Sequence, residues 1–149
     1  MNYFLMLIIS MILANAPQIN NASEALNEYV DVEEEKYFDS LEMLAICVEA
    51  EAGNQDLMGK RLVVDVILNR VDSDRFPNDI ESVISQPYQF ATYNDGSMDA
   101  VYEPSEETFK AVQMELENRT DSEILFFTAK GFNNYSEPAY KHGDHYFGY

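Results

Sequence analysis

The chain has 149 residues, with 27 acidic against 9 basic residues, a formal net charge of −18 and a single cysteine. The charge argues against binding to nucleic acid, which needs a cationic face, and against anionic membrane surfaces. One cysteine excludes an intrachain disulfide. The length and the 46% hydrophobic content predict one folded domain with a modest core.

The first segment, residues 1–25, opens with an apolar stretch from Tyr3 to Ala14. The stretch is shorter than the ~20 residues that a membrane-spanning helix needs. Together with the small-residue pattern at Ala14-Asn15-Ala16 it is typical of an export signal. No basic residue precedes it and Pro17 follows the pattern, so a retained N-terminal anchor is the alternative. We therefore expect an exported protein of the cell envelope or the extracellular space.

Residues 26–36 are polar and acidic, which predicts a linker, either a tether or a frayed helix, before a folded domain over residues 37–149. Within this domain the first helix is predicted to begin at Asp39, because Asp39 and Glu42 are spaced as a capping box. Gly53 is a natural end for this helix.

Three further helices are predicted from apolar residues at helical spacing, over residues 56–71, 78–84 and 105–117. Residues 85–98 are rich in turn formers and predict a loop. Residues 123–128 are strand-like, and a polar loop leads from them to a last apolar piece at the C-terminus. Because helices come first and a small β element last, we predict a mainly helical α+β fold.

Arg70 stands in the apolar second helix of the domain. A buried guanidinium needs a partner, so we expect an ion pair with Asp72 or Asp74.

Two glutamates, Glu49 and Glu51, occupy the last turn of the first predicted helix. On a helical wheel Glu49 continues a polar stripe that begins at Glu42, and we expect it to be solvated. Glu51 lies beside Leu44 and Cys47. Apolar neighbours raise the pKa of a carboxyl group, so Glu51 is a candidate general acid for glycosidic cleavage. A second solvated glutamate at a helix end is the alternative.

Several motifs follow each other in one order. Residues 49–71 read EAEAGNQDLMGKRLVVDVILNRV, and they are followed by Arg75-Phe76-Pro77, by Gln89-Phe90 and by a closing GDHYF over residues 143–147. This order resembles the cell-wall hydrolase family of the spore-cortex-lytic enzymes, over roughly residues 41–149. Counting back from Gly59, the family's catalytic glutamate aligns with Glu51.

The sequence departs from the family at two places. The Arg-Gly-Glu that usually follows the catalytic Glu-Ala is Gly53-Asn54-Gln55 here, and a family-like Phe-His appears as Phe127-Thr128. The first change moves a glycine and removes an acid, so we expect a different local loop.

The resemblance implies a lysozyme-like single domain that cleaves the β-1,4 bond between N-acetylmuramic acid and N-acetylglucosamine in peptidoglycan. No cofactor is expected, and two histidines and one cysteine without ligand spacing do not predict a metal site. Glu51 would protonate the leaving oxygen. Either a second carboxylate then activates water, or Glu51 acts as base while the 6-hydroxyl of the muramic acid attacks. The resemblance favours the second route, that of a lytic transglycosylase. We expect the protein to be a monomer that acts on peptidoglycan glycan strands. Spore germination, wall remodelling and phage entry or release are all compatible roles.

Five further residues are candidates for substrate binding. By resemblance Gln89 binds sugar hydroxyl or N-acetyl groups, with capping of nearby backbone as the alternative. Phe90 is a candidate sugar platform, although a core position is favoured. Tyr93 and Tyr140 are candidate stacking surfaces, and His145 is either a binding or a structural histidine.

Two other classes of protein remain open. A cysteine peptidase would use Cys47 and His145, but no turn presents the thiol at a helix N-terminus. A non-enzymatic, exported glycan-binding protein of the same fold is the alternative to the enzyme.

Overall fold

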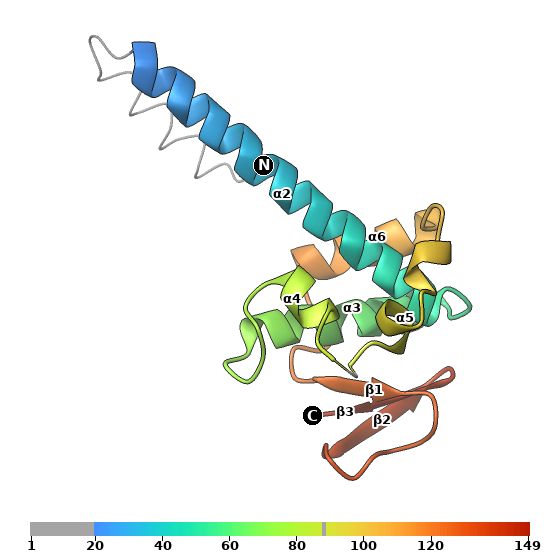
Figure 1. Cartoon of the computed structure of the whole chain (residues 1–149). Helices are drawn as coiled ribbons and strands as arrows, with labels where there is room; N and C mark the ends of the chain where they lie inside the picture. Colours follow the sequence, from blue (N-terminus) through green and yellow to red (C-terminus); the bar gives the residue numbers. More distant parts are fainter. Residues whose placement is uncertain (1–19, 88) are drawn as a thin grey trace. The chain divides into compact units, whose positions relative to one another are not determined.

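The structure is a computed structural model of the chain that describes the backbone of residues 20–87 and 89–149 and the side chains of residues 29–87 and 89–149. The apolar stretch and cleavage pattern of the expected export signal lie outside the described residues. Figure 1 shows the elements in chain order: α2 Asn20–Ala52, α3 Leu57–Asp72, α4 Ile80–Ile84, α5 Ala91–Asn94, the 3-10 helix η1 Met98–Ala100, α6 Glu106–Glu117, β1 Phe126–Thr128, β2 Pro138–His142 and β3 His145–Gly148.

Helix α2 runs from Asn20 to Ala52 without interruption. The prediction that a helix begins at Asp39 is wrong, because no glycine or proline stands between residues 20 and 52 and helix-forming residues continue through the acidic segment. The contacts within the chain nevertheless divide it into two units, residues 1–38 and 39–149. Among the described residues, no helix has both the length and the apolar character needed to cross a membrane.

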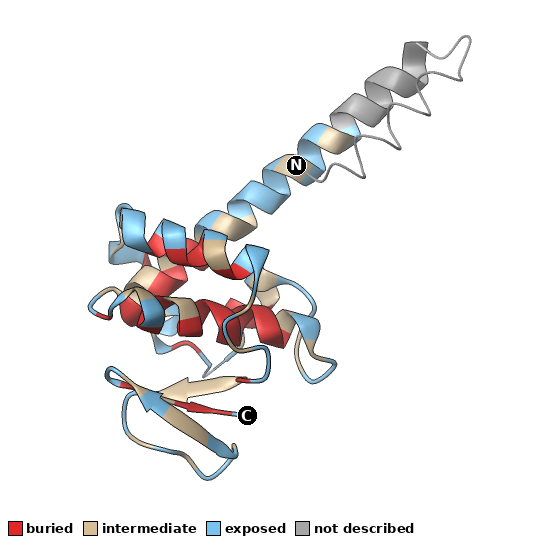
Figure 2. Cartoon of the chain, turned by 180° about the vertical axis from the view of Figure 1, so that it is seen from behind, coloured by how far each residue is buried: buried red, intermediate tan, exposed pale blue. Residues whose placement is uncertain are grey.

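Helix α3 is buried along most of its length, and in the unit of residues 39–149 it packs against α6, α4 and β1 (Figure 2). Asp56 caps its first turn by accepting a hydrogen bond from the backbone N–H of Gly59 at 2.8 Å. Asp79 and Ser105 cap α4 and α6 in the same way. The predicted helices over residues 56–71, 78–84 and 105–117 are therefore confirmed.

Arg70 is buried within α3, but the predicted ion pair is wrong. Its Nε donates to the carbonyl oxygen of Leu125 at 2.7 Å. In the part of the chain described here no carboxylate pairs with it, and Asp72 instead lies 3.4 Å from Arg119. The guanidinium carbon is 4.9, 5.3 and 5.4 Å from the centres of three rings, those of Phe76, Phe90 and Phe126. Cation–π contacts thus take the place of the expected carboxylate.

The C-terminal strands form an antiparallel sheet in the order β1-β3-β2. Phe127 pairs with Phe147, and His142 pairs with His145 across a turn at Gly143. Gly143 has a φ of 53°, a left-handed conformation that glycine adopts without strain. From the sequence β2 was expected to be part of a polar loop, because three of its five residues are polar or proline. Its pairing with β3 is also irregular. β2 is a strand because its backbone forms hydrogen bonds with β3.

A buried acidic pair joins α3 to α6. Glu115 is fully buried and accepts hydrogen bonds from the Nε of Arg61 and from the N–H and hydroxyl of Thr120 at 2.6 and 2.8 Å. Asp65 is also fully buried; its Oδ2 accepts from the N–H of Asp121 at 2.8 Å, and its Oδ1 has no hydrogen-bond partner among the described residues. Burial, followed by the nearby Glu115 carboxylate, raises the pKa of Asp65 to about 8.

This raised pKa predicts a pH dependence of stability. An unfolded chain releases the Asp65 proton near pH 4, whereas the folded chain keeps it to about pH 8. Between these values the folded state binds more protons, so this group lowers the free energy of unfolding by about 1.4 kcal/mol per pH unit as pH rises. Asp65→Asn preserves the neutral form and removes this slope. Urea unfolding at several pH values should therefore show the variant gaining stability relative to the parent toward pH 8.

Asp74→Asn is the matched control for this prediction, since it makes the same substitution at an exposed position. Stability curves of Asp65→Asn and the parent that run parallel across this pH range would contradict a protonated Asp65.

Candidate active site

Glu51 lies in the last turn of α2 and contacts α5. Its Oε1 accepts hydrogen bonds from the hydroxyl of Thr92 at 2.6 Å and from the N–H of Thr92 at 3.3 Å. The side chain is half-buried, one turn beyond the fully buried Cys47. Over the described side chains, no lysine, arginine or histidine forms an ion pair with it. Its hydrogen-bonding partner is therefore a neutral hydroxyl, which can donate to a carboxylate or accept from a carboxylic acid.

Glu49 faces a different element, and its predicted place on a solvated stripe is wrong. Its Oε2 accepts hydrogen bonds from the N–H of Ser105 at 3.1 Å, from the hydroxyl of Ser105 at 2.9 Å and from the hydroxyl of Thr108. Burial opposes ionisation, but these hydrogen bonds prevail and lower the pKa of Glu49. The carboxylate sits at the N-terminus of α6, where the helix dipole favours negative charge. Glu42, by contrast, is exposed.

Three of the predicted binding residues belong to the loop around α5. Gln89 is exposed, and Tyr93 is 42% exposed. Phe90 is only 1% exposed, and its ring centre is 6.1 Å from that of Phe127. Phe90 thus fixes the start of α5 from within the core, while Gln89 and Tyr93 on either side of it are accessible.

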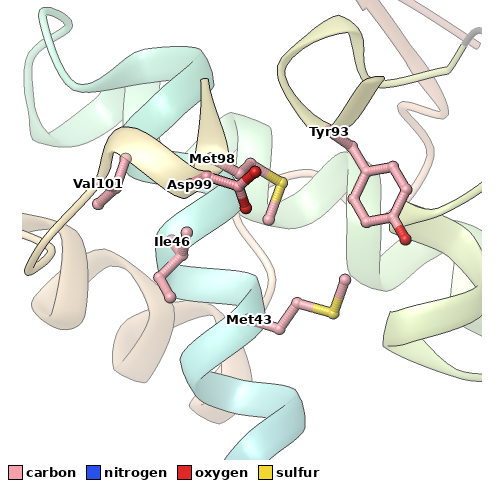
Figure 3. A pocket seen from close by; sticks show the side chains of 6 residues that line it. All are labelled: Met43, Ile46, Tyr93, Met98, Asp99 and Val101. Carbon is pink, nitrogen blue, oxygen red and sulfur yellow. The ribbon is translucent and has the colours of Figure 1, made fainter. Parts of the chain in front are cut away.

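Tyr93 lines a pocket of about 540 Å³ (Figure 3). Figure 3 shows Tyr93 across the pocket from Ile46 and Asp99, with the thioether side chains of Met43 and Met98 between them. The remaining lining residue is Val101. Glu51 does not line this pocket, although the pocket and the hydrogen bond between Glu51 and Thr92 both involve α2 and α5.

The two predicted residues of the C-terminal sheet have other partners. The hydroxyl of Tyr140 donates to Oδ2 of Asp121 at 2.9 Å, and burial together with this carboxylate raises the pKa of Tyr140. His145 is 5% exposed, and its ring centre is 5.0 Å from that of Phe127. Burial lowers the pKa of His145, and its Nδ1 has no partner among the described residues. Within the described residues, neither Tyr140 nor His145 forms a hydrogen bond with Glu51.

Thr92, the residue that contacts Glu51, was not predicted from the sequence. Thr92 follows the Gln89-Phe90 motif closely, so its place next to that motif was the available signal. Four residues that line the pocket were also not predicted, because pocket lining depends on how α2 packs against the loop: Met43, Ile46, Met98 and Asp99. No group of three or more His, Cys, Asp or Glu side chains in residues 29–87 and 89–149 is arranged to hold a metal ion.

Comparison with known proteins places this chain in a family. Residues 54–148 match the cell wall hydrolase family, and the chain belongs to it. The chain is 32% identical over 98 residues to a spore cortex-lytic enzyme of Bacillus cereus, covering 66% of this chain and 34% of that protein. It is 32% identical over 89 residues to the spore cortex-lytic enzyme of Bacillus subtilis, covering 58% and 28%. The chain thus spans about a third of the length of these curated relatives.

Solved structures of the family share the fold. The catalytic domain of the germination-specific lytic transglycosylase SleB from Bacillus anthracis superposes with a TM-score of 0.65 at 28% identity, covering 74% of this chain and 93% of that domain. The catalytic domain of the Bacillus cereus SleB protein gives a TM-score of 0.65 at 27% identity, covering 74% and 89%. The predicted family and the mainly helical α+β fold are confirmed.

The burial of Cys47 predicts an unreactive thiol, which tests the alternative that this protein is a cysteine peptidase. Cys47 is fully buried, and burial, followed by the negative charge of Glu51, raises the pKa of its thiol. A neutral, inaccessible thiol is not a nucleophile. A disulfide reagent at pH 8 should therefore label the native protein at least about 100-fold more slowly than the protein unfolded in guanidinium. Equal rates would contradict this environment.

Proposed function

We propose that this chain cleaves the glycan strands of peptidoglycan at the β-1,4 bond between N-acetylmuramic acid and N-acetylglucosamine, with Glu51 as the catalytic acid. The observation that carries the proposal is the position of Glu51, half-buried on a cell wall hydrolase domain and bonded to Thr92 rather than to a cation. The family match begins at residue 54, just after Glu51, so the role of Glu51 rests on the count back from Gly59 and on this geometry.

The proposed reaction uses one carboxyl group twice. Glu51 protonates the glycosidic oxygen as the bond to the muramic acid breaks and an oxocarbenium-like state develops. The resulting carboxylate then removes the proton from the 6-hydroxyl of the same sugar, which attacks the anomeric carbon. The product is a 1,6-anhydro-muramic acid end. The hydroxyl of Thr92, 2.6 Å from Glu51, keeps the carboxyl group oriented through both steps.

The position of Glu49 supports the route without a second carboxylate. Hydrolysis would require another carboxylate to activate water or stabilise the intermediate. Glu49 is the neighbouring acid on α2, and its hydrogen bonds to Ser105 and Thr108 direct it to the N-terminus of α6. An acid engaged in this way is not free to serve the reaction.

The place of action is part of the proposal. Peptidoglycan lies outside the cytoplasmic membrane, and membership of the cell wall hydrolase family fits an envelope or extracellular protein. We propose that residues 1–25 direct export and are either removed or kept as an anchor. The protein would act as a monomer on glycan strands and not on nucleic acid, in keeping with its net charge of −18. Among the roles left open by the sequence, the names of the relatives favour cortex lysis at spore germination.

The variant Glu51→Gln tests the catalytic role. It preserves size and can still contact Thr92, but it removes the transferable proton, so the rate of peptidoglycan cleavage should fall by about 10³-fold or more while binding to wall material persists. Release of soluble muropeptides measures the first quantity, and co-sedimentation with wall material measures the second.

Glu49→Gln is the matched control for this experiment. It should lower the melting temperature, because the cap of α6 is weakened, while cleavage well below that temperature continues. The assignment is wrong if Glu51→Gln cleaves as fast as the parent. A parent protein that binds wall material without cleaving it would instead support the non-enzymatic alternative.

A second prediction concerns Thr92. Thr92→Val keeps the shape of the side chain but removes the hydroxyl that bonds to Glu51, so kcat should fall about 10-fold to 100-fold with little change in KM. Thr92→Ser retains the hydroxyl and should stay within about threefold of the parent. Steady-state cleavage of isolated glycan strands gives both constants, and equal activity of the valine and serine variants would remove Thr92 from the mechanism.

A further inference from the structure

Gln55 joins the turn after α2 to the hairpin turn between β2 and β3. Its Oε1 accepts a hydrogen bond from the backbone N–H of Asp144 at 3.0 Å, and its Nε2 donates to Oδ2 of the same residue at 3.0 Å. The Nε2 also donates to Oδ1 of Asn54 at 2.9 Å. Gln55 is 9% exposed. One buried amide thus satisfies both a donor and an acceptor of Asp144, which a carboxylate at position 55 would not do.

The approach of the two turns is close. A Cβ atom on Gly143 would lie 2.1 Å from Oε1 of Gln55, so any larger residue at this position would displace the amide. A second contact lies next to it, where Nε2 of His142 is 2.8 Å from Oδ1 of Asp56. Asp56 also caps α3. The hairpin turn is therefore attached at two neighbouring points to the segment that links α2 to α3.

The attached turns are connected to Glu51 in two ways, along the chain and through packed side chains. Along the chain, Gln55 belongs to the turn that ends α2, with its N–H donating to the carbonyl oxygen of Ala52 at 2.9 Å. Through space, β3 carries His145, whose ring is 5.0 Å from that of Phe127, and Phe127 is 6.1 Å from Phe90. Phe90 immediately precedes α5, which carries Thr92, the hydrogen-bond partner of Glu51.

We propose that Gln55 and Asp144 form a clasp that positions Glu51 against Thr92 for glycan cleavage. Both are positioning residues, since neither contacts Glu51 in the described hydrogen bonds. The inference rests on the proposed function for its kinetic consequence, whereas the clasp itself is a property of the fold. Its requirement is specific: an amide must face the Asp144 carboxylate, because two carboxylates at this distance repel.

Four proteins test the requirement: the parent, Gln55→Glu, Asp144→Asn and the double variant. Only Gln55→Glu places two carboxylates together. Asp144→Asn faces Gln55 with a second amide, and the double variant restores an amide–carboxylate pair with the roles exchanged. Gln113→Glu on α6 is the matched control, because it adds the same charge and also faces a carboxylate, that of Glu117, but at an exposed position.

On isolated glycan strands, kcat of Gln55→Glu should fall about tenfold with KM within about twofold, while the double variant and Gln113→Glu should stay within about twofold of the parent. The assays are run at a temperature where circular dichroism shows every variant fully folded, so that a change in kcat does not come from a loss of folded protein. Gln55→Glu with the parent's kcat, or a double variant as impaired as Gln55→Glu, would overturn the proposal.

A readout without substrate separates this inference from the proposed function. The side-chain carboxyl ¹³C resonance of Glu51 and the hydrogen-exchange protection of the backbone amide of residue 144 should change in Gln55→Glu and return toward the parent's values in the double variant. If the parent fails to cleave peptidoglycan, the proposed function is wrong, and these two signals still decide the clasp. Signals that are unchanged in Gln55→Glu would overturn it.

Discussion

The hydrogen bonds of Glu49 at the N-terminus of α6 fix the last turn of α2, and the site depends on that turn. The carboxylate accepts from the N–H and hydroxyl of Ser105 and from the hydroxyl of Thr108. Gly53 makes room for this arrangement, since a Cβ there would lie 2.5 Å from the carbonyl oxygen and 2.9 Å from Oε1 of Glu49. With Glu49 directed to one helix, Glu51 is presented to another. The two acids have different partners because their side chains leave the helix on different sides.

The altered Gly53-Asn54-Gln55 segment has a structural account. Gly53 permits the close approach of Glu49, and Asn54 and Gln55 join the hydrogen bonds that reach Asp144. The departure from the family pattern therefore replaces an acid by an amide where a carboxylate of the hairpin turn faces it. The change lies next to Glu51, which forms its hydrogen bonds to Thr92 with these residues in place. This is why we place the catalytic role in Glu51 despite the unusual residues that follow it.

What the sequence could predict was local. Apolar spacing and capping residues located α3, α4 and α6, and the wheel separated Glu49 from Glu51. Features that depend on contacts distant in sequence were missed or misjudged. Glu49 looked solvated because its partners lie in α6, β2 looked like a loop because it is defined by β3, and Arg70 was given a carboxylate because ring contacts leave no local pattern. Asp39 looked like a helix start, since a cap motif says nothing of a helix already in progress.

The central claim is that Glu51 works without a second carboxylate, and the chemistry of the products tests it most directly. Isolated glycan strands would be digested in H₂¹⁸O and the fragments analysed by mass spectrometry. Attack by the 6-hydroxyl predicts fragments that end in 1,6-anhydro-muramic acid, lighter by one water than hydrolytic fragments and free of ¹⁸O. Reducing ends that carry ¹⁸O would show that water attacks, and would contradict the single-carboxylate account.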